Sequence, residues 1–245
     1  MKSETYVPIL NSSVLAVVPA YNEEESIEAV IRDLTNHGFS FVVVSDGSTD
    51  RTVAICEELG AKILKIPINL GVGVALRVGF QYAIENGFDA VAQVDADGQH
   101  PIESIAELIN KMNTTRSHLV VGSRFYSDEA QYEVEISRKF AMNTLSWLAS
   151  RACCTKISDS TSGFRLIRRP LLDVLAKNMS NNYLGDTFET LVASGRSGFK
   201  VSEIPVSMSY RKFGVSSASN PVAIKYILKG LLTTVLKLHW KVRTT

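Results

Sequence analysis

The sequence predicts an α/β fold, with a mostly parallel central sheet flanked by helices. Short apolar runs rich in β-branched residues alternate with amphipathic helical segments, each pair taking about twenty to thirty residues. The chain has 245 residues and is 45% hydrophobic, which is enough for one large core. Carboxylates follow several of the apolar runs. Because ligands bind at the carboxyl ends of parallel strands, we expect the functional site there.

The first unit is an apolar run at residues 14–18, which predicts a buried parallel strand that ends at Pro19. Asn22 is expected to cap the following helix, whose first turn is acidic. Gly38 is expected to end it. The helix shows apolar residues at helical spacing, namely Ile27, Val30, Ile31 and Leu34.

The second predicted strand covers residues 41–44 and runs into Ser45-Asp46-Gly47-Ser48. Thr49 or Asp50 is expected to cap a helix at residues 53–59. Asp46 has no capping role at its position, so its carboxylate is interpreted as a ligand group. Residues 61–66 predict a third strand.

Residues 69–79 partly match a dinucleotide-binding fingerprint, but Leu76 stands where the third glycine belongs. The unit also follows the third strand, not the first. We therefore expect a helix whose start and inner face are small, so that it lies close to a ligand or to the sheet. The small residues are Gly71, Gly73, Ala75 and Gly79. Arg77 is interpreted as a solvated helical arginine in preference to a diphosphate ligand.

Within residues 91–100 an apolar run ends in two carboxylates, Asp95 and Asp97, which a glycine and a carboxamide follow. On a buried strand both would face the same side and repel each other, unless a cation or solvent separates them. Hard cations such as Mg²⁺ or Mn²⁺ are held by one or two carboxylates, with other positions left for water and phosphate oxygens. The alternative is a solvated strand-to-helix turn, with Pro101 opening the next helix.

In the second half of the chain, the pattern predicts a helix at residues 102–112 and a strand at residues 119–121. Arg124 follows this strand, and its guanidinium can pair with phosphate. Residues 128–135 are interpreted as an acidic mobile loop. From residue 136 an apolar helical face follows, interpreted as an ordinary packed helix. Asp159 and Arg165 flank a glycine turn. A helix at 186–194, a strand at 200–204 and a basic glycine-hinged loop at 210–217 complete this part.

Residues 220–243 form a wide apolar face edged by lysines, with a tryptophan near the end. Such a helix is typical of a membrane interface, and a helix docked on the protein or on a partner subunit shows the same pattern. The membrane interface is the favoured interpretation. The lysines that share one i+4 ridge are Lys225, Lys229, Lys237 and Lys241.

The net charge, the cysteine count and the length of the apolar runs argue against several classes of protein. A net charge of +1 does not suggest a nucleic-acid-binding surface. Three cysteines, two of them adjacent, do not suggest a disulfide framework, so a reducing compartment is expected. No run reaches the roughly 18 apolar residues of a spanning helix, and no leader pattern opens the chain. The expected location is cytoplasmic, peripheral on the cytoplasmic face of a membrane.

Seven motifs in order resemble the family 2 glycosyltransferases, and more closely the branch that contains dolichyl-phosphate mannose synthases and polyprenyl-phosphate sugar synthases. The resemblance covers nearly the whole chain. Its carriers are residues 19–23, 46–50, 69–79, 95–100 and 122–124, Asp159 with residues 162–165, and Arg211 with Gly214 and Ser216.

The resemblance implies a GT-A fold with a divalent cation, Mg²⁺ or Mn²⁺. The implied metal ligands are Asp95, Asp97 and Gln99. The implied donor-binding residues are Pro19, Ala20, Tyr21, Glu23, Asp46, Ser48, Gly71, Asp95, Ala96 and Ser216. The acceptor phosphate would meet Arg124 and Arg138, and the residues expected to serve catalysis are Asp97, Asp159 and Arg211.

The activity implied is an inverting transfer of a hexose from a nucleotide sugar, UDP- or GDP-linked, to a polyprenyl phosphate. Two departures leave the base and the sugar open: Ser45 replaces the first of the family's paired aspartates, and Ser216-Ser217-Ala218 replaces its serine-lysine-leucine. An acceptor sugar hydroxyl is the alternative, with Asp159 or Glu189 as base. A non-catalytic nucleotide-sugar-binding subunit is a second alternative.

The domain organisation expected is a catalytic domain at residues 1–219, including an interface helix at about 136–153, followed by a C-terminal amphipathic helix at 220–245. Expected partners are the nucleotide sugar, a lipid phosphate, the membrane surface, and a small membrane subunit or a second copy of the chain. Nucleic acid is not expected as a partner.

Overall fold

The computed structural model describes residues 6–124, 136–179 and 185–209, and for residues 136–141 it describes the backbone alone. The acidic loop expected at 128–135, the basic loop at 210–217 and the C-terminal helix at 220–245 lie outside the described residues. In the part of the chain that is described, no helix is both long enough and apolar enough to cross a membrane.

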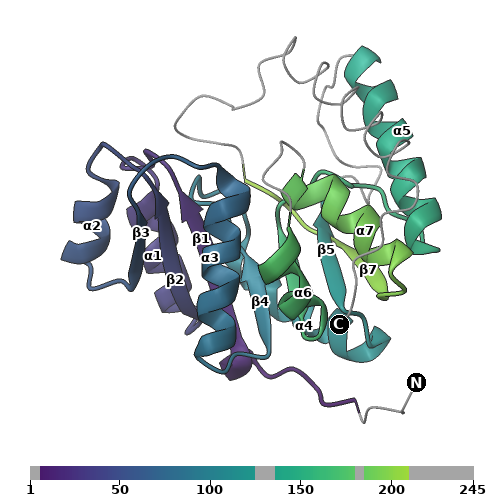
Figure 1. The fold of residues 1–245 in the computed structure, drawn as a ribbon, viewed down its shortest axis with the longest axis horizontal. Coiled ribbons are helices and arrows are strands. Elements are labelled where there is room, and N and C mark those ends of the chain that lie inside the picture. The colour runs from purple at the N-terminus through teal and green to yellow at the C-terminus, as the bar shows by residue number, and fades with distance from the viewer. Residues whose placement is uncertain (1–5, 125–135, 180–184, 210–245) are drawn as a thin grey trace.

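A seven-stranded sheet forms the centre of the molecule, with strand order β3-β2-β1-β4-β6-β5-β7 (Figure 1). All neighbouring strands pair in parallel except β6, which is antiparallel to both β4 and β5. The predicted mostly parallel α/β sheet is therefore confirmed. The strands are β1 (Val14–Ala20), β2 (Ser40–Asp46), β3 (Ile63–Ile66), β4 (Ala90–Gln93), β5 (Leu119–Ser123), β6 (Arg165–Arg168) and β7 (Val201–Pro205).

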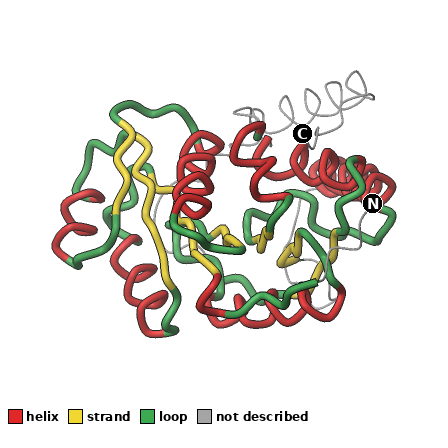
Figure 2. Tube along the Cα trace, turned by 60° about the horizontal axis from the view of Figure 1, so that its bottom comes forward, coloured by secondary structure: helices red, strands yellow, loops and turns green. Residues whose placement is uncertain are grey.

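Helices cover both faces of the sheet, and Figure 2 shows the strands between these two layers. The described α-helices are α1 (Ile27–Asn36), α2 (Thr52–Glu58), α3 (Val72–Glu85), α4 (Ile105–Thr115), α5 (Ile136–Cys153), α6 (Leu171–Asn178) and α7 (Thr190–Arg196). Short helical turns precede two of them, η2 (Ile102–Ser104) before α4 and the π-helical turn η3 (Gly185–Glu189) before α7.

Alternating side chains of the buried strands divide the core into two clusters. Leu15 and Val17 of β1 face the cluster that contains residues of α3, α5, α6 and α7. Ala16 and Val18 face the opposite cluster, with residues of α1 and α4. A strand buried on both faces has no polar side, which is why β1 reads as a continuous apolar run.

Helix α3 lies unusually close to β1 because its inner face is small. A Cβ atom added at Gly79 would overlap Cγ1 of Val17. Ala75, one turn earlier, is fully buried. The expectation that this helix packs closely against the sheet is therefore confirmed.

One local expectation is wrong, and one alternative is resolved. Asn22 does not cap α1: it has a positive φ of 54°, and its side-chain Oδ1 accepts a hydrogen bond from the Thr49 N–H at 2.8 Å. It ties two loops together across the sheet edge instead. Strand β4 ends at Gln93, so Asp95 and Asp97 lie on a turn between the strand and the next helix, as the alternative interpretation has it. The turn gives the two carboxylates access to solvent.

Candidate active site

A cleft of about 450 Å³ opens at the carboxyl ends of β1, β2 and β4. This is the edge where ligands bind in open α/β sheets, and the volume is in the range of small-molecule sites. The predicted site residues that line the cleft are Pro19, Ala20, Tyr21, Glu23, Asp46, Gly71, Asp95, Ala96 and Asp97. Segments far apart in the sequence thus converge on one cavity, as the motif pattern predicts.

The turn after β4 carries the two predicted metal ligands. The Asp95 side chain is 41% exposed, and Gly163 approaches it so closely that an added Cβ would lie 3.2 Å from its Oδ2. The backbone N–H of Asp95 donates to Nδ1 of the buried His100 at 2.9 Å. His100 therefore carries its proton on Nε2, which faces Asp95 Oδ2 at 3.5 Å. The imidazole lies next to the carboxylate, where an outer-shell partner of a metal ligand would lie.

The donor set in the cleft suits a hard divalent cation that is shared with a substrate. Asp95 and Asp97 supply carboxylate oxygens, the ligands that Mg²⁺ and Mn²⁺ prefer. Among the residues that the structure describes, no group of three or more histidine, cysteine or acidic side chains could enclose a metal by itself. A cation at this turn would need further oxygens, which water and substrate phosphates supply.

Asp46 binds the backbone of the loop before α3, which lines the cleft. Its Oδ1 accepts the N–H of Leu70 at 2.9 Å, and its Oδ2 accepts the N–H of Gly71 at 2.7 Å. Gly71 has a φ of 96°, which favours glycine, and α3 begins at the next residue. The carboxylate therefore fixes the entry to α3, whose N-terminal end favours anions and faces the cleft.

Other predicted donor-binding residues have structural partners. Ser48 does not line the cleft: its hydroxyl donates to the Ala20 carbonyl at 3.4 Å and accepts from the Asn22 N–H at 3.2 Å. Glu23 lines the cleft, and its N–H donates to Thr52 Oγ1 at 2.8 Å. Tyr21 is 46% exposed at the cleft and offers a ring surface to a ligand.

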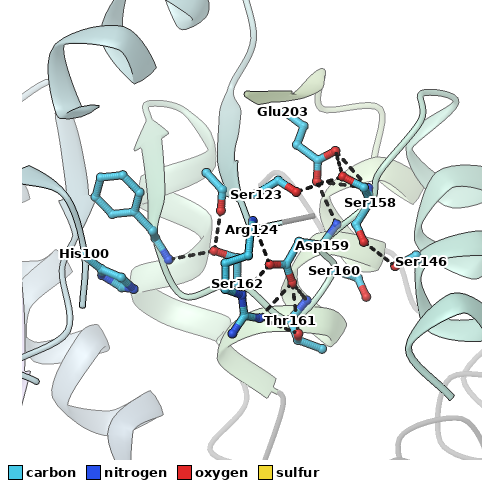
Figure 3. Close-up of polar contacts among 12 residues, drawn as sticks. His100, Ser123, Arg124, Ser146, Ser158, Asp159, Ser160, Thr161, Ser162 and Glu203 are labelled. Carbon is cyan, nitrogen blue, oxygen red and sulfur yellow. Dashed lines mark hydrogen bonds and ion pairs between the residues drawn. The ribbon is translucent and has the colours of Figure 1, made fainter. Parts of the chain in front are cut away.

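Arg124 and Asp159 form a bidentate ion pair beside the cleft (Figure 3). Arg124 Nε lies 2.7 Å from Asp159 Oδ2, and Nη2 lies 3.0 Å from Oδ1. The Asp159 side chain is fully buried and the Arg124 side chain is 32% exposed. Thr161, which lines the cleft, accepts a further hydrogen bond from Arg124 Nη2 at 3.1 Å. Neither Arg124 nor Asp159 is among the residues that line the cleft, and the Asp159 carboxylate holds the guanidinium next to Thr161, which does.

Sequence reasoning missed Asp186 and Thr187, which line the cleft from η3. Burial raises the pKa of Asp186 to about 6; Arg165 opposes this rise and Asp95 adds to it. Within the described residues the buried Thr187 hydroxyl has no hydrogen-bond partner. Asp186 was expected only as the start of a helix. Nothing in its local pattern indicates that the fold returns it to the cleft.

Arg165 explains how η3 is held at the cleft. This fully buried side chain donates to the Thr187 carbonyl at 2.7 Å and to the Ser162 carbonyl at 2.7 Å. Burial lowers its pKa to about 10, an effect that Asp186 and Asp159 oppose. The arginine therefore joins the loop after α5 to the π-helical turn.

Of the remaining predicted site residues, only Gln99 has a described side chain. Gln99 does not line the cleft, and its Nε2 donates to the Ser209 carbonyl at 3.2 Å. Arg138 belongs to α5, in the segment whose side chains lie outside the described structure. Arg211 and Ser216 also lie outside the described residues.

Comparison with known proteins supports the sequence interpretation. Residues 15–175 match the family described as Glycosyl transferase family 2. A UDP-N-acetylglucosamine-dolichyl-phosphate N-acetylglucosaminyltransferase from Methanococcus voltae is 28% identical over 225 residues, covering 84% of this chain and 90% of the relative. A polyprenol monophosphomannose synthase from Mycolicibacterium smegmatis is 27% identical over 216 residues, covering 84% of this chain and 80% of the relative.

Among solved structures, the chain is similar to glucosyl-3-phosphoglycerate synthase from Mycobacterium tuberculosis, crystallised with Mn²⁺, UDP and glucosyl-3-phosphoglycerate. The TM-score is 0.65 at 22% identity, and the likeness covers 91% of this chain and 78% of that one. This likeness confirms the predicted GT-A fold.

Proposed function

Because this chain belongs to glycosyl transferase family 2, we propose that it is an inverting, metal-dependent transferase that moves a hexose from a nucleotide sugar to a polyprenyl phosphate. The observation that carries the proposal is the pair of carboxylates, Asp95 and Asp97, at the cleft where the β1, β2 and α3 motifs meet. Two carboxylates shared with substrate oxygens are typical of sites for a cation-bound diphosphate.

The donor half of the proposal uses the side of the cleft formed after β1 and β2. Ala20, Tyr21 and Glu23 would contact the nucleoside, and the anion-favouring end of α3 would face the diphosphate. The name of the Methanococcus relative specifies a UDP-linked donor, and the Mycobacterium structure holds UDP with Mn²⁺. Both support a UDP-sugar as the first donor to test. Ser216 and Arg211 would complete the donor site from the basic loop.

The chemistry is an in-line attack by a phosphate oxygen on the anomeric carbon, with a nucleoside diphosphate leaving. Asp95 and Asp97 would hold a cation, which would supply neutralisation of the charge that develops on the leaving diphosphate, a contribution typically worth several kcal/mol. Arg124 and Arg138 would bind the acceptor phosphate, since a guanidinium fork matches phosphate oxygens. That nucleophile is already ionised, so the reaction needs no strong general base.

A transfer to a sugar hydroxyl is the second candidate, and Asp186 is the observation that favours it. A hydroxyl must lose a proton, and an effective base has a pKa near the working pH. Asp159 is engaged by Arg124, and Glu189 is buried and does not line the cleft. Asp186 both lines the cleft and has a pKa raised to about 6. If the acceptor is a hydroxyl, Asp186 is the base.

The deciding experiment incubates the enzyme with labelled UDP- and GDP-sugars and either polyprenyl phosphate or soluble glycans, with Mg²⁺ or Mn²⁺. Labelled polyprenyl product, lost in EDTA and restored by added cation, supports the proposal. Asp97→Asn is expected to lower the rate by about 10²-fold or more, while Glu103→Gln on the exposed side of η2 leaves it unchanged. Full activity in EDTA would remove the metal from the mechanism, and product on glycans alone would favour the second candidate.

We also propose that the enzyme works at the cytoplasmic membrane surface, with a catalytic domain at 1–219 and a membrane-facing helix at 220–245. A lipid-linked acceptor requires such contact, and Trp147 on α5 is 59% exposed with Arg151 stacked on its ring. We further propose that the chain has a protein partner, either a small membrane subunit or a second copy of the chain. Retention on anionic liposomes, lost on deletion of residues 221–245, tests the surface assignment. Unchanged retention would contradict it.

A further inference from the structure

Glu203 is a buried carboxylate in the middle of β7, the last strand of the sheet. Charged residues on edge strands are commonly solvated and prevent pairing with other chains. Glu203 is only 6% exposed, so solvation does not explain it. A buried carboxylate requires strong hydrogen-bond donors, and their positions show what this one does.

The donors to Glu203 come from the loop that follows α5 (Figure 3). Its two oxygens accept the Ser158 N–H at 3.0 and 2.9 Å, and Oε1 also accepts the Asp159 N–H at 2.9 Å. The Ser158 hydroxyl donates to Oε2 at 2.7 Å. Because that hydroxyl proton is used, the Ser123 hydroxyl must donate the hydrogen bond that joins it to Ser158 Oγ at 2.8 Å.

These bonds place Asp159 by its backbone, while its side chain points to Arg124. The Asp159 carboxylate holds Arg124 through Nε and Nη2, and it also accepts the Thr161 hydroxyl at 3.1 Å. Arg124 directly follows Ser123, the last residue of β5. Both ends of the ion pair are therefore joined to Glu203, one through the Asp159 backbone and one through Ser123 and Ser158.

We propose that Glu203 is a positioning residue for acceptor binding, which acts through the Ser158–Asp159 loop to set the plane and place of the Arg124 guanidinium. This inference rests on the proposed function, in which Arg124 binds the acceptor phosphate. The Glu203 carboxylate accepts hydrogen bonds from the two backbone N–H groups of the loop, so these donors are not available to the phosphate. The ion pair at Arg124 then offers the acceptor a guanidinium of fixed orientation.

Loss of Glu203 should affect acceptor binding alone, whereas loss of a residue that only stabilises the fold should affect donor and acceptor binding alike. Without the carboxylate, the buried N–H groups of Ser158 and Asp159 lose their acceptor, and Asp159 no longer fixes Arg124. The donor side of the cleft does not depend on these bonds: Asp46 and Gly71 are held by their own contacts. The defect should therefore appear in acceptor KM and not in donor KM.

The test measures KM for polyprenyl phosphate and for the nucleotide sugar with the full-length chain. Glu203→Ala is expected to raise acceptor KM about tenfold, with donor KM within about twofold of wild type. The acceptor KM of Glu203→Gln should lie between those of wild type and Glu203→Ala. The amide of the glutamine keeps one oxygen, which still accepts the N–H groups at the Oε1 position. Asn113→Ala is the matched control: it removes partners of Ile9 and Tyr6 far from the cleft and should change neither KM.

A double-mutant cycle separates positioning from general destabilisation. In an Arg124→Ala background, Glu203→Ala is expected to change acceptor KM by less than about twofold, because the group it positions is gone. Additive effects, an unchanged acceptor KM, or an equal rise of both KM values would overturn the inference. If Glu203→Ala does not fold, the same comparisons are made with Glu203→Gln. Wild-type enzyme without transfer to polyprenyl phosphate would overturn the proposed function itself, a result distinct from all of these.

Discussion

The carboxylate of Asp46, the last residue of β2, accepts the N–H of Gly71, 25 positions later in the chain, at 2.7 Å. The same side chain accepts the Leu70 N–H at 2.9 Å. An acidic residue at the cleft thus shapes the cleft by holding the loop before α3. Gly47, beside it, has a φ of 71° and leaves no room for a Cβ against the Ile68 and Asn69 backbone. The two loops are in van der Waals contact there.

Replacement of Asp46 should weaken donor binding more than it weakens the fold. Asp46→Ala leaves the N–H groups of Leu70 and Gly71 without their acceptor, so the entry to α3 shifts away from the diphosphate. We expect the dissociation constant for UDP, measured by calorimetry, to rise about tenfold. Asp33→Ala on the exposed face of α1 is the control. Equal UDP affinity in both variants would contradict the role given to Asp46.

Replacement of Asp186 distinguishes the two acceptor classes. With polyprenyl phosphate as acceptor, Asp186→Asn should retain kcat within about tenfold of wild type, because no base is needed. With a hydroxyl acceptor, loss of the base should lower kcat by about 10² to 10⁴-fold. Single-turnover rates with each acceptor provide the measurement. A loss of the larger size on polyprenyl phosphate would show that Asp186 takes part in that transfer.

The close approach of α3 to β1 makes Gly79 a sensitive position for stability. Gly79→Ala would place a methyl group against Val17, and we expect a loss of about 1–3 kcal/mol in the free energy of unfolding. Gln81→Ala on the exposed side of the same helix should cost less than about 0.5 kcal/mol. Urea unfolding followed by circular dichroism compares them. A stabilised Gly79→Ala would mean that the helix has room to move away from the sheet.

Asp50 gives the fold a pH dependence of known sign. Partial burial would raise its pKa, but hydrogen bonds from Thr52 and from the Glu24 N–H outweigh this and lower it. A carboxylate with a lowered folded pKa contributes stability above its unfolded pKa and loses it as the pH falls through the folded value. Asp50→Asn should therefore be less stable than wild type at pH 7, and the difference should shrink below about pH 4.

Urea titrations of wild type and Asp50→Asn at a series of pH values measure this difference. Glu107→Gln, at an exposed position of α4, provides the control change of charge. A difference that stays constant down to the acid limit would show that Asp50 acts by packing and not by its charge.

Local patterns were sufficient for most elements of the fold. The β-branched runs predict strands at β1, β2 and β5 because a strand covered on both faces needs apolar side chains throughout. The small residues before and within α3 predict its close packing, which Gly79 and Val17 show. The carboxylates at the end of β2 and just after β4 indicate the edge at which the cleft opens, because the carboxyl ends of parallel strands lie on one side of the sheet. Strand β6 was not predicted, since Arg165 places a charge in a run of only four residues.

By itself the sequence determined most of the strands, the edge of the sheet at which the cleft opens and the family, because these depend on local patterns and on motifs in order. Only the tertiary structure decided which polar groups meet. It brought Asp186 into the cleft, paired Asp159 with Arg124 and buried Glu203 against the loop between them. Those contacts join residues tens of positions apart, and the spacing of residues along a chain does not specify distances in space.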